Sequence, residues 1–321
     1  MHLLIYVPIA VSALAAVGAW PLAERLPPRT ATWLLTVSAV VLAGTSCAAL
    51  GFLAMAAAMR LPVVDSMGGM SLRAVIYLDP ASLPVGVIAA ALFWGAALAA
   101  VRAAWLRGAA LMGARRDARH LAGDGELAGG EQVLTIVDDR VDAYAVPGRP
   151  ARIVITSGMI DALTKSERDV LLAHERAHVS ACHYAFTALV RLSAAANPLL
   201  RPLAAAVNYS VERWADERAA SVTGSRRLVA HTVAKAALAS AAAPARRTGP
   251  AMVLARLTGP SQLGRRGSVP RRVDALLGPP PQRSIVLLAL AIAVLTICGV
   301  AAVDAAGDLH AMVEFAQAAL S

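Results

Sequence analysis

The chain has 321 residues, of which 58% are hydrophobic, and its mean hydropathy is +0.60. Soluble domains contain about 45–50% apolar residues, so this excess argues against a purely soluble protein. The net charge of +9 comes almost entirely from arginine, which gathers at the cytoplasmic ends of membrane spans. No compact module of basic and aromatic residues accompanies this charge, so we expect no direct nucleic-acid binding.

Four apolar runs are long enough to cross a bilayer, which takes about 20 residues. The first run lacks the basic start of a signal peptide, so we expect it to be retained as a helix that is broken at Pro21. The runs cover residues 3–22, 31–58, 82–101 and 285–303. We therefore predict about four transmembrane helices in contact with the lipid bilayer.

The placement of arginine predicts the orientation of these helices. Arg25 and Arg29 lie between the first two runs, and further arginines follow the third run and precede the fourth. The residues after the fourth run include acidic side chains but no Arg or Lys. The positive-inside rule then places the N-terminus outside and the long segment before the fourth run in the cytoplasm. The expected parts are three transmembrane helices in residues 1–101, a cytoplasmic domain in residues 102–284, a fourth helix in residues 285–303 and a short extracytoplasmic tail in residues 304–321.

Local patterns predict several elements of the cytoplasmic domain. Residues 132–137 and 152–156 are rich in Val and Ile, which indicates strands. Thr164 and Glu167 form a capping-box pattern, so a helix should begin near Lys165 and run through His178.

The remaining segments of this domain give weaker signals. Residues 185–207 are apolar but contain two arginines, so we expect helices at the junction with the membrane rather than a fifth span. A further helix should carry Glu212 and Asp216. Residues 241–283 are rich in Pro, Gly and Arg, and we expect them to be irregular.

The most specific pattern is His174-Glu175-Arg176-Ala177-His178, which reads His-Glu-x-x-His. On a helix, residues four apart share a face, so the two imidazoles converge on one point and can hold one Zn²⁺ ion. Glu175 lies about 100° around the helix from His174. It can therefore act as a general base towards a water activated by the metal without itself being a ligand.

A hydrolytic zinc site needs a third protein ligand and one open position. Glu212 is the best candidate, because it lies on a predicted helix some distance after the first motif. Asp216 lies four residues later on the same face and would accept a hydrogen bond from a ligand imidazole. The alternative is that Glu212 belongs to a solvated helix face, since charged residues surround it.

Other polar residues are weaker candidates. Cys182 is not needed as a ligand, because two histidines and one carboxylate already complete a hydrolytic site. His183 is expected to turn away from the metal and to lie at an interface. His231, Tyr209 and Arg213 are candidates to stabilise the oxyanion that hydrolysis develops, and a surface helix position is the alternative for His231.

Three segments, residues 142–148, 153–159 and 172–178, resemble the metallopeptidase cores of two related families. One comprises the BlaR/MecR-type peptidases of bacterial beta-lactam sensing, and the other is the HtpX and CAAX-prenyl endopeptidase group. Asn197-Pro198-Leu199, the later stretch 212–217 and the predicted order of spans resemble the BlaR/MecR type more closely. The HtpX-like group often has His-Pro before its last motif, where this chain has Val269-Pro270.

The resemblance implies a gluzincin fold. The chain would be a multi-pass α-helical membrane protein with an inserted, mainly helical α+β metallopeptidase domain. Zn²⁺ would be bound by His174, His178 and Glu212, with Glu175 as the general base and Asp216 supporting a ligand. The strand near residues 153–156 would border the site and could pair with an extended substrate.

We therefore expect a zinc-dependent endopeptidase in the plasma (inner) membrane of a bacterial cell, with its catalytic domain in the cytoplasm. The substrate would be a protein or peptide, such as a cytoplasmic transcriptional repressor, or the chain itself. A penicillin-binding sensor domain follows the fourth span in the BlaR/MecR-type transducers. Only residues 304–321 follow it here, so direct beta-lactam sensing is not expected.

Two alternatives stay open. One is a membrane quality-control protease of the HtpX type, and the other is a non-catalytic signalling scaffold with structural zinc. A second copy of the chain is a further candidate partner.

Overall fold

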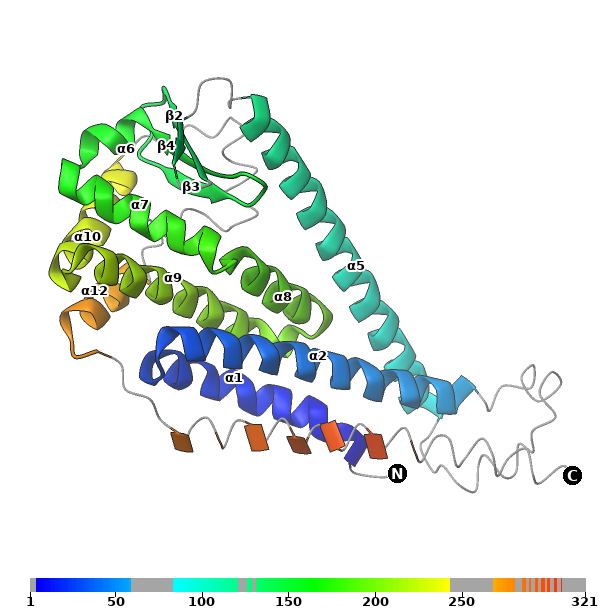
Figure 1. Ribbon diagram of the computed structural model, residues 1–321. Coiled ribbons are helices and arrows are strands. Elements are labelled where there is room, and N and C mark those ends of the chain that lie inside the picture. The colour runs from blue at the N-terminus through cyan, green and yellow to red at the C-terminus, as the bar shows by residue number, and fades with distance from the viewer. Residues whose placement is uncertain are drawn as a thin grey trace, which may run out of the picture.

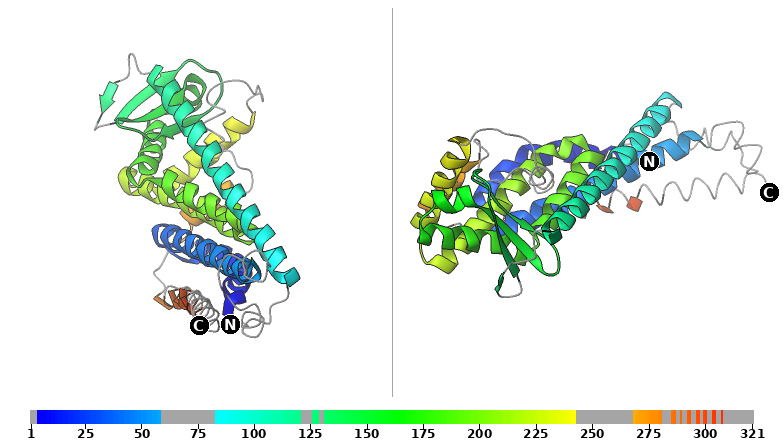
Figure 2. Two further views of the ribbon diagram at one scale, coloured as in Figure 1. Left: turned by 90° about the vertical axis from the view of Figure 1, so that its right-hand side faces the viewer. Right: turned by 90° about the horizontal axis from the view of Figure 1, so that it is seen from above.

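The computed structural model describes residues 4–58, 83–120, 126–128, 131–242 and 268–280, together with isolated residues between 285 and 307 (Figure 1). A small sheet lies at one end of the molecule and two long N-terminal helices lie at the other (Figure 2). The helices that carry the predicted site residues lie between these two layers.

Among the described residues, three helices are long and apolar enough to cross a membrane, and they correspond to the first three predicted runs. They are α1 (Val7–Arg25), α2 (Pro28–Ala58) and α5 (Leu83–His120), and α1 follows a short 3-10 turn, η1 (Leu4–Tyr6). The fourth predicted run, residues 285–303, lies partly outside the described residues.

The expected break at Pro21 does not occur, because α1 continues through Pro21 to Arg25. The helix ends where Leu26 turns to an extended conformation, with φ −83° and ψ 154°. Leu26 precedes Pro27, and the residue before a proline is disfavoured in the helical region. Pro28 then begins α2, at a position where the missing N–H has no cost.

Helix α5 is longer than the third apolar run and continues for 38 residues to His120. The expected boundary between residues 101 and 102 therefore falls inside a continuous helix. The arginines that follow Val101 end the apolar run without ending the helix, because arginine and alanine are good helix formers. At the far end of α5, Ala114 and Ala118 pack against Val146 and Val154 of the sheet.

The sheet has the strand order β1-β2-β4-β3, with β2 and β4 parallel and the other pairs antiparallel. The predicted strands are present as β2 and β4, whereas β1 and β3 were not expected. The strands are β1 (Glu126–Ala128), β2 (Glu131–Ile136), β3 (Ala143–Val146) and β4 (Ala151–Thr156). Because β4 pairs on both sides, the expectation that this strand could accept a substrate is wrong. The edge strand on that side is β3.

The capping box begins α7 as the sequence predicts. The Thr164 N–H donates to Oε2 of Glu167 at 2.8 Å, and the helix runs from Lys165 to Ser180 after the short helix α6 (Ser157–Ala162). Buried residues of α6, α7 and the sheet form one core with the later helices α9 (Arg201–Thr223), α10 (Arg226–Ala242) and α12 (Val269–Leu277). This core holds α7 between the sheet and α9 (Figure 1).

Residues 185–207 form helices, as predicted, and these pack on the N-terminal pair. Helix α8 (His183–Ala196), the 3-10 turn η3 (Pro198–Leu200) and the first half of α9 share an apolar core with α1 and α2. Arg213 donates from Nη1 to the carbonyls of Ala23 at 2.5 Å and Glu24 at 3.3 Å. The helix that carries Glu212 is therefore anchored directly to the end of α1.

Part of the segment expected to be irregular is helical. Residues 269–277 form α12, in which Val269, Arg272 and Leu276 are buried. Their spacing of three and four residues puts them on one helix face. Residues 243–267 and 281–284 lie outside the described residues.

A buried polar contact joins α1 and α2 to the end of α8. The side-chain amide of Asn197 donates to Oγ of Ser12 at 3.0 Å and to Oγ of Ser46 at 3.2 Å. We predict that Asn197→Ala lowers the free energy of unfolding by about 1–2 kcal/mol, because it removes interhelical hydrogen bonds from an apolar setting. Thermal unfolding in detergent, followed by circular dichroism, measures the change.

The matched control is Thr45→Ala, because the Thr45 hydroxyl donates only within its own helix, to the carbonyl of Val41 at 2.9 Å and that of Leu42 at 3.4 Å. If both variants unfold at the same temperature, the Asn197 contact does not stabilise the packing of these helices.

Candidate metal centre

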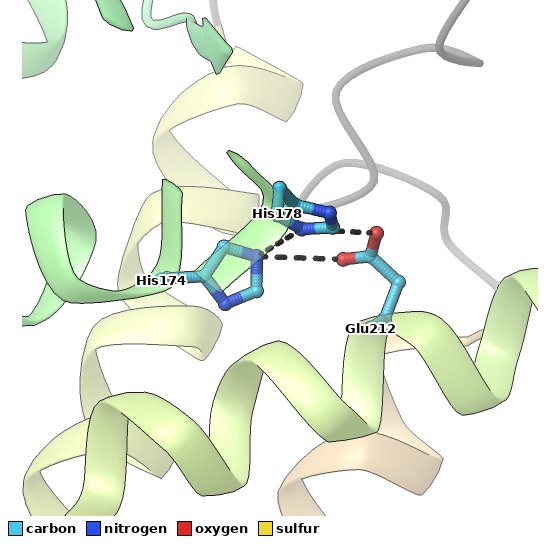
Figure 3. Close-up of side chains that lie close together, drawn as sticks. All are labelled: His174, His178 and Glu212. Carbon is cyan, nitrogen blue, oxygen red and sulfur yellow. Dashed lines mark hydrogen bonds and ion pairs between the residues drawn. The ribbon is translucent and has the colours of Figure 1, made fainter. Parts of the chain in front are cut away.

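Two helices bring the predicted ligands together (Figure 3). His174 and His178 project from α7, and Glu212 projects from α9, with one possible ligand atom of each within 4.8 Å of the others. Nε2 of His174 lies 3.1 Å from Nε2 of His178. Oε2 of Glu212 lies 3.6 Å from Nε2 of His174, and Oε1 of Glu212 lies 3.6 Å from Nε2 of His178.

A second layer of charged contacts holds this group. Oδ1 of Asp216 lies 3.0 Å from Nδ1 of His174, on the side of the ring opposite Nε2. This contact is the one expected of Asp216, and it leaves Nε2 of His174 directed at His178 and Glu212. Carboxylates in this position orient ligand imidazoles in metal sites.

Arg272 of α12 completes the second layer and was not predicted as a site residue. Its guanidinium is fully buried and donates to both oxygens of Asp216, at 2.7 Å and 2.6 Å. It also lies 3.0 Å from Oε2 of Glu212. Breaking a buried ion pair of this kind costs about 3–5 kcal/mol, because a charge is left without its partner. The only signal in the sequence was an arginine at helical spacing between apolar residues in 269–276.

These contacts determine the charges of the carboxylates. Burial alone would raise the pKa of Glu212, but Arg272 and the two imidazoles lower it to about 2. Burial would also raise the pKa of Asp216, but Arg272 and His174 lower it, and Arg272 has the larger effect. Both groups are therefore anionic at neutral pH, as a metal ligand and its supporting acceptor need to be.

Glu175 lies beside the ligands on α7 and is 5% exposed. Its pKa is raised to about 8, mainly by burial. The positive charges of His174 and Arg272 oppose this rise, whereas the negative charges of Glu212 and Asp142 add to it. A carboxyl whose pKa is raised towards neutrality is suited to accept and return a proton.

His183 is not part of the ligand group, but it contacts a ligand histidine, which helical spacing did not predict. Its Nδ1 lies 3.1 Å from Nδ1 of His178, and its side chain is buried against Trp214. Helical spacing assumes that α7 continues through His183. Instead, Cys182 adopts a left-handed conformation with φ 52° and separates α7 from α8. A left-handed residue is a usual way to end a helix, although it is uncommon for a residue other than glycine.

The contact between His178 and His183 decides which nitrogen of His178 faces the ligand group. Burial lowers the pKa of His178 to about 4 and that of His183 to about 2, so both rings are neutral. If Nδ1 of His178 carries the proton and donates to Nδ1 of His183, Nε2 of His178 keeps a free lone pair for a metal. His183 then performs for His178 the role that Asp216 performs for His174.

Comparison with known families agrees with this geometry. Residues 115–248 match the model of Peptidase family M48. The match indicates a metallopeptidase. No curated protein and no solved structure matches the chain.

The matched segment contains all three candidate ligands and Glu175, and it ends before Arg272. It supports a metallopeptidase of the gluzincin type without confirming the BlaR/MecR-type assignment. Peptidases of this family generally depend on zinc.

The donor set of the peptidase domain fits zinc. Two imidazole nitrogens and one carboxylate are a usual ligand set for hydrolytic zinc, which leaves a fourth position open. Tetrahedral bonds of about 2.0–2.1 Å place neighbouring ligand atoms about 3.3 Å apart. The two imidazole nitrogens are 3.1 Å apart, and each lies 3.6 Å from one oxygen of the Glu212 carboxylate, which is close to that value.

The weaker candidates lie in other contacts. Nδ1 of His231 is 3.2 Å from Glu167, with 68% of the His231 side chain exposed, so it occupies the expected surface position. Tyr209 packs against Trp20 of α1, and Arg213 caps the end of the same helix. Cys182 is exposed at the turn between α7 and α8 and is not part of the ligand group.

We predict that His183→Ala weakens zinc binding by about 10–100-fold, because His178 loses the partner that orients it. His183→Asn, which keeps a hydrogen-bond acceptor, should recover part of this loss. Competition with a fluorescent chelator measures the affinity. His120→Ala is the control, since His120 is exposed on α5. Equal zinc affinity in the wild type and in His183→Ala would contradict this role.

Zinc affinity should also depend on pH. Burial alone would lower the pKa of His174, but Asp216 and Glu212 raise it to about 10. Zinc must then displace one proton from His174 throughout the neutral range, so its affinity should rise about tenfold per pH unit. The measurement is best made between about pH 6 and 9 in the Glu175→Gln variant, because the Glu175 carboxyl would add a proton of its own.

The control for this pH dependence is Asp216→Asn in the same background. This change removes the carboxylate that raises the His174 pKa, so zinc affinity should level off at a lower pH. An affinity independent of pH over this range would show that His174 is already neutral before zinc binds.

Proposed function

We propose that the chain is a membrane-anchored, zinc-dependent endopeptidase. The observation that carries the proposal is the convergence of His174, His178 and Glu212 in a segment that matches a metallopeptidase family. These three residues would hold the metal, and Asp216, Arg272 and His183 would orient them.

Hydrolysis would follow from the placement of Glu175. Zinc, when bound, supplies Lewis-acid chemistry that activates water and polarises a peptide carbonyl. Glu175 takes a proton from the attacking water as its oxygen bonds to the carbonyl carbon. Glu175 then delivers this proton to the amide nitrogen as the C–N bond breaks. Its burial raises the carboxyl pKa, which favours holding the proton until the C–N bond breaks.

The contacts of α9 support a site at the cytoplasmic surface of the bacterial plasma membrane. Arg213 binds the end of α1, and the guanidinium carbon of Arg29, in the first turn of α2, lies 5.8 Å from the Trp214 ring centre. Glu212 therefore lies level with the turn between α1 and α2. Arg25 and Arg29 mark that turn as cytoplasmic under the positive-inside rule.

The substrate that we propose is a regulatory protein, such as a cytoplasmic repressor, or the chain itself. A protease for membrane quality control would share the same chemistry. Comparing membrane and cytoplasmic proteomes with and without active enzyme separates the two. One accumulating protein would favour a dedicated regulator, and many accumulating misfolded proteins would favour quality control.

We predict that Glu175→Gln retains about one zinc per chain but loses at least about 10²-fold in peptide hydrolysis, because only the proton acceptor is removed. His174→Ala and Glu212→Ala should lose both zinc and hydrolysis. Metal analysis and turnover of a peptide library by detergent-purified protein provide the two measurements.

The matched control is Glu217→Gln, because Glu217 lies on α9 and forms a half-buried ion pair with Arg226 at 2.7 Å. This variant should retain both zinc and turnover. Unchanged turnover in Glu175→Gln would overturn the mechanism and leave zinc with a structural role in a membrane scaffold.

A further inference from the structure

A pocket with three arginines lies away from the metal centre, between α5 and the turn that follows β3. We call it the arginine pocket. It encloses about 390 Å³ and is lined by Arg115, Gly148, Arg149 and Arg152. The residues come from three parts of the chain, because α5, the β3–β4 turn and β4 meet there.

Two of the arginines are held by neutral partners. Nε of Arg115 donates to the carbonyl of Pro147 at 2.9 Å, and Nε of Arg152 donates to Oε1 of Gln132 at 3.0 Å. Within the part of the chain that the structure describes, no carboxylate forms an ion pair with these arginines or with Arg149. Three guanidinium groups around one pocket repel one another, and an anion bound there would relieve that repulsion.

The pocket is joined to the metal centre by the edge strand. Ala143, the first residue of β3, lies in the same buried core as Ala173, which precedes His174 and Glu175 on α7. The other end of β3 leads into Pro147, Gly148 and Arg149. From Ala143 to Pro147 an extended strand covers about 13 Å. Strand β3, which lies beside α7 (Figure 1), thus runs from the helix that carries the candidate base to the arginine pocket.

An extended peptide can add to a sheet edge through main-chain hydrogen bonds. Among the described strands, β3 is paired only with β4, so its other edge has no strand partner there. Antiparallel pairing is the commoner arrangement and would place the N-terminal part of the peptide at the end of β3. With the cleaved bond near Glu175, a residue about four to six positions earlier would reach the arginine pocket.

We propose that the arginine pocket is a specificity subsite for an acidic side chain, about four to six residues before the cleaved bond. This inference rests on the proposed endopeptidase function and names a class of substrate for it. An Asp or Glu carboxylate suits the pocket, because guanidinium groups bind carboxylates through charge-assisted, often paired hydrogen bonds.

The position of the pocket favours a peptide over a lipid headgroup. Arg102 is the first arginine after the apolar part of α5, and about 20 Å of helix separates it from Arg115. The pocket therefore lies well beyond the end of the apolar run, on the same side as the sheet.

The test uses the full-length enzyme in detergent and peptides that it cleaves. The residues four, five and six positions before the cleaved bond are set in turn to Glu or Gln, and kcat/KM is measured. We expect Glu to exceed Gln by about tenfold or more at one of these positions. Arg149→Gln and Arg115→Gln should remove this preference and leave cleavage of the Gln peptides unchanged. Arg116→Gln, an exposed neighbour on α5, should keep the preference.

Three results would overturn the proposal. Equal cleavage of Glu and Gln peptides at all three positions would reject the subsite while leaving the proposed function intact. No cleavage of any peptide would reject the proposed function and the subsite with it. If phosphatidylglycerol vesicles bind the wild type and not Arg149→Gln, while both enzymes treat Glu and Gln peptides alike, the pocket recognises a lipid headgroup instead.

Discussion

The candidate metal centre depends on one buried cation, the guanidinium of Arg272. Glu212 and Asp216 lie one helical turn apart on α9, and both are buried. Without an opposing charge, two buried carboxylates so close together would take up protons rather than stay ionised. Arg272 contacts both, and through Asp216 it also determines the orientation of His174. The short helix α12 is therefore a part of the site, although it follows Glu212 by about 60 residues.

Helix α9 links this site to the membrane helices. Its first half packs on α1 and α2, its middle carries Glu212 and Asp216, and its last turns enter the core with α7 and α10. The peptidase portion and the N-terminal helices are consequently not separate bodies joined by a linker. A change in the packing of α1 and α2 would shift the position of Glu212, because the next residue, Arg213, binds the end of α1.

Features with a local cause were predictable. The capping box begins α7 at the expected residue, because its hydrogen bonds lie within a few positions of one another. The His-Glu-x-x-His spacing places two imidazoles together for the same reason. Extending a local pattern further was less informative. Helical spacing did not predict the contact between His183 and His178, because Cys182 interrupts the helix between them. The edge position of β3 depends on which strands pair with one another, and the pattern of apolar and polar residues within a strand does not predict that pairing.

By itself the sequence determined the kind of chemistry, since the motif on α7 and the carboxylates on α9 are the donor types that hydrolytic zinc needs. It also determined that long apolar helices accompany that chemistry, and three of them lie among the described residues. Only the tertiary structure decided which groups surround the ligands. Arg272 reaches the site through a buried ion pair and His183 through a left-handed turn at Cys182, and neither follows from nearby residues. The arginine pocket was decided in the same way, because α5 meets the β3–β4 turn only through packing of Ala114 and Ala118 on the sheet.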